Sequence, residues 1–418
     1  MSPTVPDDGP PPLPPSGFEP PPYPYDRLLT IKARAAARFA DDGGLVDCSI
    51  GTPCDPPPPA VLEAMASSGT ERGYPTSQGS RAYREAAAGW LARRFGVSVD
   101  PDTELAACVG TKEFVASTAQ YLRLRTPGRD TVLYPAVSYP TYAMGALLGG
   151  CRPVPVRELP DGRGLDLASV DPTDIDRALL VWANTPSNPS GALTDMDRVA
   201  AWGRSHGIPV FSDECYAEFT WDGPPATVLS TGLDGVVAVH SLSKRSNLAG
   251  ARVGFYAGDP DLVGFLLEVR KHAGLMVAGP VQAGGAIAYA DDEHVVDQRH
   301  RYHERLDFLA GVVADIGVPT PIPAGGFYLW VPVPEAHRAG SGTSGHGSGG
   351  GGGIGDADGS GAWALTEDLA VEGGLLVSPG DLYGPDGAGH VRMAVVQPME
   401  RLELAADRLS RAGSLTPH

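Results

Sequence analysis

The segment HSLSKRSNLAGARVGF, residues 240–255, contains Lys244 directly after an apolar run and Arg252 eight residues further along the chain. The apolar run predicts a buried strand, and a residue just after such a strand lies at the carboxyl edge of a parallel sheet, where open α/β folds bind ligands. A lysine there can attack an aldehyde only if burial or a neighbouring cation lowers its pKa. Arg252 and the hydroxyls of Ser241 and Ser243 are suitable donors for a phosphate ester. An exposed lysine beside a capping serine is the alternative for Ser-x-Ser-Lys alone, and the position of Arg252 in a glycine-bracketed strand weighs against it.

Strands and helices alternate around this segment. Apolar runs bounded by turn residues predict strands, and helical apolar periodicity predicts helices. Such alternation indicates a mostly parallel sheet with helices on both faces, which places the chain in the α/β class. The predicted strands cover residues 131–135, 178–184, 209–213, 235–241 and 251–258, and the predicted helices cover residues 80–95 and 196–207 and begin near Lys112 and Tyr142.

The remaining segments predict a second, smaller α+β domain. A helix at 27–40 and a strand at 45–50 form an entry segment, and a long helical tract after Pro260 suits a link between two domains. A glycine-rich surface loop at 340–361 interrupts the later segments 325–333, 364–374, 375–380 and 390–396. We therefore divide the chain into a proline-rich disordered arm (1–24), an N-terminal segment of the small domain (25–50), a large domain (51–280), and an interdomain helix with the small C-terminal domain (281–418).

Composition narrows the classes of partner. The 418 residues are 42% hydrophobic and 20% charged, as in ordinary globular proteins. A formal charge of -18 disfavours nucleic acid and anionic membranes as partners. The cysteines are scattered and odd in number, so we expect free thiols and neither disulfides nor a metal site. The acidic, proline-rich start does not resemble a signal peptide and no segment is long enough to span a membrane, so we expect a cytoplasmic protein.

Polar residues follow two more predicted strands. Asn184 and Asn188 come after the strand 178–184, and Asp213 and Tyr216 come after the strand 209–213. A buried carboxylate such as Asp213 keeps a pyridine nitrogen protonated, and that cation makes the ring an electron sink. Asn188 and Tyr216 can donate to a ring hydroxyl. An ordinary turn and an ordinary helix cap are the alternatives for each motif alone, and the order of the motifs in one chain favours a common site.

Three other positions suit the same ligand. Gly110, Thr111 and Lys112 open a helix whose backbone amides can bind phosphate, with a plain capped helix as the alternative. Tyr139 follows the strand 131–135 and could stack on an aromatic ring, with a core tyrosine as the alternative. Tyr74 lies on a glycine-rich loop, from which its hydroxyl could reach a phosphate of its own or a neighbouring subunit.

Arg392 lies inside the apolar segment HVRMAVV. A guanidinium is costly in such a place unless it is paired with an anion. Bidentate binding of a substrate carboxylate is one explanation, and a buried structural salt bridge is the other.

Together these blocks resemble the class I/II aminotransferases, pyridoxal-phosphate (PLP) enzymes of fold type I related to aspartate aminotransferase, from about residue 25 to the end. The resemblance implies PLP as cofactor, a large domain with a mostly parallel sheet, a smaller α+β domain, amino acid and 2-oxo acid substrates, and a homodimer with shared active sites. For catalysis and the ring it implies Lys244 as the Schiff-base lysine and proton carrier, Asp213 at the ring nitrogen, Asn188 and Tyr216 at the ring hydroxyl, and Tyr139 stacked on the ring. For the phosphate it implies Gly110, Thr111, Lys112, Ser241, Ser243 and Arg252, with Tyr74 from the partner subunit, and for the substrate carboxylate it implies Gly51, Asn184 and Arg392.

Within this family, the segments HSLSKRSNLAGARVGF, LEVRKHAGLMVAGPVQA, SIGTPCDPPPP and GYPTSQGS are similar to actinobacterial N-succinyldiaminopimelate aminotransferases. That similarity implies transfer of the glutamate amino group to N-succinyl-2-amino-6-oxopimelate, in lysine and diaminopimelate biosynthesis. The distal carboxylates of such a substrate call for extra cations, and the candidates are Lys32, Arg34, Arg245, Arg270 and Lys271.

Other activities remain open on sequence grounds. A class I/II aminotransferase for a different amino acid or a fold type I β-lyase would carry the same cofactor motifs, because a fold does not fix a reaction. A non-enzymatic sensor domain of a transcription regulator would need an attached basic segment, whereas this chain begins with proline and acidic residues.

Overall fold

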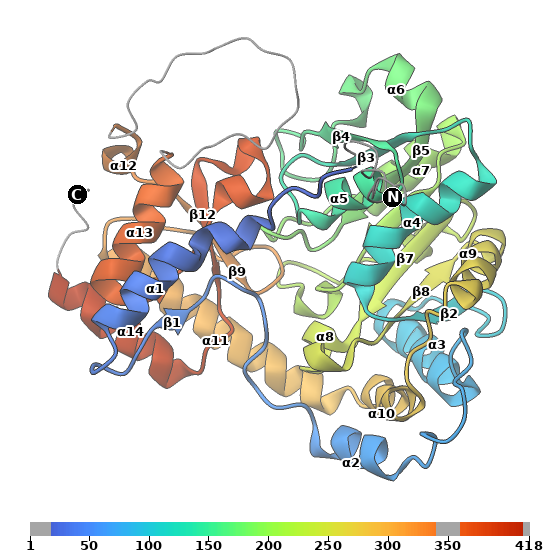
Figure 1. The fold of residues 1–418 in the computed structure, drawn as a ribbon, viewed down its shortest axis with the longest axis horizontal. Coiled ribbons are helices and arrows are strands. Elements are labelled where there is room, and N and C mark those ends of the chain that lie inside the picture. The colour runs from blue at the N-terminus through green and yellow to red at the C-terminus, as the bar shows by residue number, and fades with distance from the viewer. Residues whose placement is uncertain (1–17, 340–359, 413–418) are drawn as a thin grey trace, which may run out of the picture.

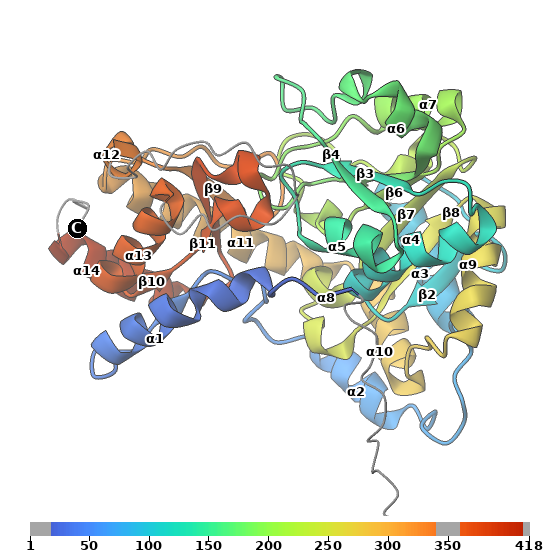
Figure 2. The same ribbon diagram turned by 45° about the horizontal axis from the view of Figure 1, so that its top comes forward.

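The computed structural model describes residues 18–339 and 360–412. Figure 1 shows two lobes joined by the long helix α11 (Glu293–Asp315), with the large sheet in one lobe. Figure 2 shows the same two lobes from a second direction. Within the described ranges no helix is long and apolar enough to cross a membrane.

The large lobe is built on a seven-stranded sheet of order β2-β8-β7-β6-β5-β3-β4. Strand β8 is antiparallel to both of its neighbours and the other pairs are parallel, so the mostly parallel sheet expected from the sequence is confirmed. The strands are β2 (Leu105–Cys108), β3 (Thr131–Pro135), β4 (Arg152–Val156), β5 (Ala178–Asn184), β6 (Val210–Asp213), β7 (Val236–Ser241) and β8 (Gly254–Gly258).

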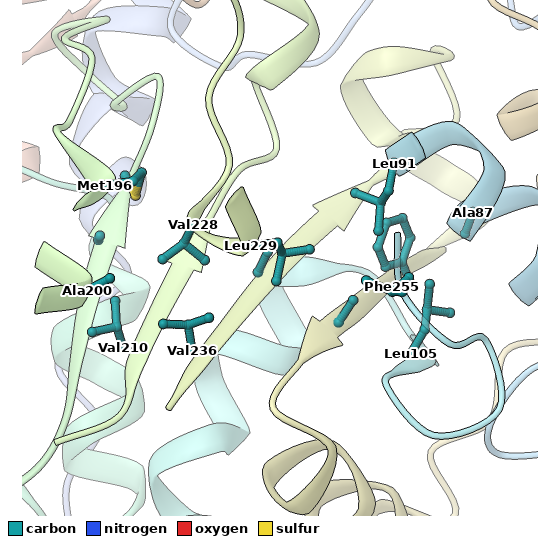
Figure 3. Close-up of a cluster of buried hydrophobic side chains, with 14 of the residues drawn as sticks. Ala87, Leu91, Leu105, Met196, Ala200, Val210, Val228, Leu229, Val236 and Phe255 are labelled. Carbon is teal, nitrogen blue, oxygen red and sulfur yellow. The ribbon is translucent and has the colours of Figure 1, made fainter. Parts of the chain in front are cut away.

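Helices cover both faces of this sheet because successive strand residues point to opposite sides. Val181, Val210, Val236 and Phe255 belong to one core cluster, part of which Figure 3 shows, while their neighbours Trp182, Phe211, Val237 and Tyr256 belong to the opposite one. The first cluster includes residues of α3 (Arg81–Phe95), α7 (Met196–His206) and α10 (Gly279–Ala290), and the second includes residues of α4 (Thr111–Arg125), α5 (Thr141–Leu148) and α9 (Pro260–His272). The sheet is therefore buried on both sides, as its continuous apolar strands require.

The smaller lobe has its own core. A three-stranded antiparallel sheet of order β11-β12-β9 packs with α11, and β1 pairs with β10 in parallel. Its strands are β1 (Val46–Asp47), β9 (Tyr328–Pro332), β10 (Leu375–Leu376), β11 (Ser378–Pro379) and β12 (His390–Ala394). Its helices besides α11 are α1 (Leu29–Arg38), α12 (Glu335–Ala339), α13 (Gly361–Gly373) and α14 (Met399–Ala412). The domain boundaries given above remain a prediction.

Several predicted elements differ in extent. The strand expected at 45–50 is only β1, because the chain turns toward the large lobe after residue 47. The strand expected from 251 begins at residue 254, since Arg252 has the left-handed φ of +54°. The long helical tract divides into α9, α10 and α11. The sequence analysis did not identify β4, α2 (Pro59–Ser67), α6 (Pro172–Arg177) or α14.

The proline-rich arm is described from residue 18 onward, and residues 1–17 and most of the loop 340–361 lie outside the described part. A 3-10 turn, η1 (Pro24–Leu28), leads into α1. Tyr23 is in contact with Lys112, and Tyr25 is in contact with Tyr383. The end of the arm therefore joins the two lobes.

Candidate active site

The carboxyl ends of neighbouring strands bring the predicted residues together. Asn184 and Asp213 end β5 and β6 and are paired in register, and Ser241 ends β7 beside them. Lys244 follows in the four-residue helix α8 (Leu242–Arg245). Parallel strands share one carboxyl edge, so residues far apart in the chain meet there for a topological reason.

Lys244 lies partly open to this site, and its Nζ donates to the backbone oxygen of Gly51. Burial above all, together with the nearby cations of Arg392 and Arg252 and against an opposing effect of Cys215, lowers the pKa of the Lys244 amine to about 8. A pKa in this range makes the neutral amine available near neutral pH. Lys244 therefore has the proton affinity expected of a nucleophile and proton carrier.

Asp213 is buried and oriented by two donors. The Tyr142 hydroxyl donates to its Oδ2 at 3.0 Å, and the Cys215 amide donates to its Oδ1 at 3.2 Å. Burial raises the pKa of Asp213, while the hydrogen bonds from Cys215 and Tyr142 favour the carboxylate. A protonated ring nitrogen would stabilise the charged form further. Tyr142 was not singled out in the sequence, although its place three residues after Tyr139 on a helix start was a usable signal.

The expected phosphate residues form a cradle. Gly110 precedes α4 with a φ of +77°, and a Cβ at this position would collide with the guanidinium of Arg252. Ser241 and Ser243 have their hydroxyls 2.8 Å apart, and Ser241 caps α8 by accepting from the Ser243 amide. No carboxylate of the described residues pairs with Arg252. A guanidinium that lacks such a carboxylate, two hydroxyls and a helix N-terminus fit a phosphate ester.

Thr111 belongs to the same cradle, and its Oγ1 accepts from the Cys215 thiol at 3.0 Å. Cys215 thus lies between Thr111 and Asp213, a position that the sequence analysis did not assign. The Lys112 side chain turns outward, where its Nζ lies 3.3 Å from the Tyr23 hydroxyl and 5.7 Å from the centre of the Tyr139 ring. We therefore assign only the backbone amide of Lys112 to the cradle.

Arg392 is buried on β12, close enough to Lys244 to lower the pKa of that amine. Its Nη1 donates to Asn188 Oδ1 at 2.9 Å and its Nη2 to the Ser49 backbone oxygen at 2.6 Å. Its Nε has no partner, and among the described side chains no carboxylate pairs with it. This arrangement does not match the structural salt bridge that was the alternative for Arg392. A buried cation without an anion is unfavourable unless a ligand supplies one.

Aromatic rings enclose Arg392, and the sequence analysis assigned none of them. The guanidinium lies 4.3 Å from the Tyr328 ring centre and 4.8 Å from that of Tyr383. Tyr328 shares a hydrogen bond of 2.7 Å with Tyr216, and a Cβ on Gly51 would meet the Tyr328 hydroxyl. The pairing of β9 with β12 could have revealed Tyr328, because it places Tyr328 opposite Ala394, two residues from Arg392 and therefore on the same face.

The structure gives the other predicted residues roles or positions that differ from those expected. Asn184 supports the loop: its Nδ2 donates to the Asp213 backbone oxygen and its Oδ1 accepts from the Asn188 amide. Tyr74 is 99% exposed, so the fold of this single chain does not bring it into the cradle. The five cations proposed for distal carboxylates have other contacts: Lys32 with Asp47, Arg34 with Glu367, Arg245 with Glu218 and Asp292, Arg270 with Glu113, and Lys271 near Glu268. Each of these cations therefore has an acidic neighbour within the chain, and Arg245 and Arg270 are buried against theirs.

This fold and site define a PLP-dependent transferase, and the family model "Aminotransferase class I and II" matches residues 44–409. The chain belongs to this family, whose members depend on PLP. It is 40% identical over 93% of its length to the 4-dedimethylamino-4-oxo-anhydrotetracycline transaminase of Streptomyces rimosus (99% of that protein covered), and 38% identical over 93% to a probable aminotransferase of Mycobacterium tuberculosis (85% covered). Among solved structures, a probable N-succinyldiaminopimelate aminotransferase from Thermus thermophilus superposes with a TM-score of 0.77 at 30% identity, over 92% of this chain and 99% of that one.

Proposed function

We propose that this protein is an N-succinyl-L,L-2,6-diaminopimelate:2-oxoglutarate aminotransferase, acting by alternating half-reactions at Lys244. The observation that carries transamination is the position of Arg392, a buried guanidinium without a carboxylate partner among the described residues, near the low-pKa amine of Lys244. Arg392 is thus placed to bind the α-carboxylate common to all amino acid substrates. A β-lyase would use the same lysine, and release of ammonia and a keto acid from cystathionine would identify it.

Bound PLP would supply an aldehyde carbon and an electron-withdrawing ring. Arg392 would hold the substrate carboxylate and fix which bond at the α-carbon faces Lys244. The Lys244 amine would then remove the proton from the α-carbon of the substrate and later return it, so that the amino group can be transferred. Asp213, fixed by Tyr142, would maintain the positive charge on the ring nitrogen, and Asn188 through its Nδ2 and Tyr216 would bind the ring hydroxyl.

The similarity to the Thermus protein supports the succinylated substrate. Among the described residues, Lys112 is a suitable cation, because its side chain contacts the phenols of Tyr23 and Tyr139 rather than carboxylates. Phenols leave the charge of an ammonium group available to an incoming anion. We assign Lys112 to a distal carboxylate of the substrate, in place of the cations that the structure pairs elsewhere.

A substrate with fused rings is the second candidate. The Tyr25 ring contacts the rings of Tyr23 and Tyr383, and Lys112 Nζ lies over the rings of Tyr23 and Tyr139. In addition, 40% identity relates the chain to a transaminase that acts on an anhydrotetracycline. Tyrosine rings stack well on flat aromatic ligands.

Half-reactions decide between these candidates. The holoenzyme would be mixed in a stopped-flow instrument with glutamate, with N-succinyl-L,L-diaminopimelate, and with the 4-amino anhydrotetracycline scaffold, each without an acceptor. Loss of the visible cofactor absorbance with the first two compounds supports the proposal. A response to glutamate and the anhydrotetracycline alone would replace the pathway assignment, and no response to any amino donor would contradict transamination.

Lys112→Met should raise KM for N-succinyl-L,L-diaminopimelate by roughly 10- to 160-fold, because a charge-assisted hydrogen bond contributes on the order of 1.5–3 kcal/mol. Its matched control is Arg34→Ala, which removes an exposed cation already paired with Glu367 and should leave KM unchanged. Steady-state kinetics of both variants provide the measurement. Equal KM values for Lys112→Met and the parent would exclude a role for Lys112 in substrate binding.

We also propose a homodimer in which Tyr74 of each subunit completes the phosphate site of the other. Its full exposure supports this role, because the side chain is accessible to a second copy of the chain. Tyr74→Phe should release PLP faster on dialysis while the oligomeric state in analytical ultracentrifugation stays the same. Equal PLP retention in the variant and the parent would remove Tyr74 from the site.

A further inference from the structure

The helix that carries Lys244 has only four residues. A single helical turn has too few internal hydrogen bonds to be stable alone, so contacts from elsewhere must fix it. Those contacts come from the three residues that follow Lys244 in the chain. Arg245, Ser246 and Asn247 all bond to the junction of α10 and α11 or to the first turns of α11, and we call this set of contacts the lysine anchor.

Arg245 is the centre of the lysine anchor and is buried. Its Nη2 donates to Asp292 Oδ1 at 2.8 Å and to the Asp291 backbone oxygen at 3.1 Å, and its Nη1 donates to the Ala288 backbone oxygen. Its Nε donates to Glu218 Oε1 at 3.0 Å. One guanidinium thus joins α8 to the end of α10, to the start of α11, and to the segment that carries Tyr216.

The next two residues extend the lysine anchor along α11. The Ser246 hydroxyl is 2.9 Å from His294 Nε2, and Asn247 Nδ2 donates to Gln298 Oε1 at 3.0 Å. Asn247 has the left-handed φ of +56°, which asparagine tolerates better than most residues.

Helix α11 also contacts the loop whose backbone oxygen accepts a hydrogen bond from the Lys244 amine. Asp55 accepts from Gln298 at 2.8 Å and from both terminal nitrogens of Arg305 at 2.7 and 2.8 Å. Asp55 belongs to the same loop as Gly51, whose backbone oxygen accepts from Lys244. Helix α11 and its junction with α10 therefore contact both the segment that follows Lys244 and the loop that contains Gly51 and Asp55. Figure 1 shows α11 beside α8.

We propose that Arg245 is a positioning residue for Lys244: by tying α8 to the junction of α10 and α11, it holds the amine in its half-buried position at the edge of the sheet. This inference rests on the proposed role of Lys244. It assigns Arg245 to the lysine rather than to substrate. Because α11 also packs in the core of the small lobe, the same contacts make the position of Lys244 depend on the orientation of that lobe.

The test follows the proton affinity of Lys244 in the full-length protein after removal of cofactor. Trace labelling with acetic anhydride, read by peptide mass spectrometry across pH, gives the apparent pKa of this amine. In the parent the labelling rate should rise with pH and level off above about 8, since only the neutral amine reacts. The charged groups nearest to Lys244, which are Arg252, Arg392 and the Cys215 thiol, are unchanged in every variant below.

Arg245→Met should raise the apparent pKa of Lys244 by about one unit or more, because a less fixed amine is better hydrated. Arg245→Lys, which keeps a charge near Glu218, should recover part of that shift. Arg93→Met is the matched control: Arg93 also donates to Asp292, at 2.8 Å, but makes no contact with α8, so its profile should overlay the parent. In the holoenzymes, the pH titration of the visible cofactor absorbance should move in the same order.

Thermal unfolding measurements show whether each variant still folds, so that a change in the position of Lys244 can be told apart from a loss of the fold. If Arg245→Met does not fold, Asn247→Gly decides, because glycine keeps the left-handed backbone and removes the side-chain bonds to Gln298 and to the Pro56 backbone oxygen. A raised Lys244 pKa in that variant supports the proposal. The proposal is overturned if the labelling profile of folded Arg245→Met or Asn247→Gly overlays that of the parent. It is also overturned if Arg93→Met shifts the Lys244 pKa by the same amount. Since labelling needs no substrate, this outcome is independent of the half-reaction test of function.

Discussion

Replacing Lys244 by Ala is expected to lower kcat by on the order of 10⁴-fold or more, because one amine acts both as the attachment point of the cofactor and as the carrier of the α-proton. Among the described residues, the cations close enough to lower the Lys244 pKa are Arg252 and Arg392, and a guanidinium cannot replace the amine because it stays protonated at neutral pH. Single-turnover reaction with glutamate, followed by the cofactor absorbance, measures this loss. PLP should still bind through the cradle formed by Gly110, Ser241 and Ser243.

Lys244→Arg provides the control for charge. It keeps a cation and a long side chain at this position but has no neutral amine, so its rate should match that of Lys244→Ala. Recovery of more than a small part of the parent rate in the arginine variant would show that position 244 supplies only charge, and the mechanism would have to be rewritten.

Replacing Arg392 by Met is expected to lower kcat/KM for every amino donor by roughly 30- to 4000-fold, which corresponds to the 2–5 kcal/mol lost when one partner of a buried charged hydrogen bond is removed. Both the glutamate and the succinylated half-reactions should suffer, since the α-carboxylate is common to them. The pKa of Lys244 should also rise, because Arg392 is one of the cations that lower it. Half-reaction kinetics and the labelling profile measure the two effects.

Arg408→Met is the matched control for Arg392. Arg408 is equally buried in the small lobe, but its Nε donates to Asp42 at 3.2 Å and it lies outside the site. Its replacement should lower the melting temperature and leave kcat/KM of the remaining folded enzyme unchanged. If the two variants lose the same fraction of activity per folded molecule, Arg392 has no special relation to substrate.

The motif residues of the large lobe were accessible from the sequence because topology alone assembles them. Asn184, Asp213 and Ser241 each end a parallel strand, and parallel neighbours must share a carboxyl edge. The chemistry of each residue type then sufficed to assign a ring nitrogen to Asp213 and an aldehyde to Lys244. The predicted alternation of strands and helices was correct for the same reason, since continuous apolar strands need cover on both faces.

The partners of charged side chains could not be predicted from the sequence. Arg245 and Arg270 look like surface cations in the sequence, yet both are buried against acidic residues from distant segments. Lys112, which the motif assigned to the phosphate, turns toward Tyr23 at the end of an arm that composition alone marks as disordered. The partners of these side chains depend on which elements pack together, and the pattern of residues along one segment does not predict that packing.

The sequence by itself therefore determined the fold class, the family and the residues at the sheet edge, because strand periodicity and motif order can be read directly from the order of the residues. Only the tertiary structure decided how the site is tuned and held. Tyr142 reaches Asp213, Tyr328 and Tyr383 surround Arg392, and α11 anchors the Lys244 helix through Arg245. Each of these contacts joins segments far apart in the chain, and their geometry is set by the packing of two lobes across one long helix.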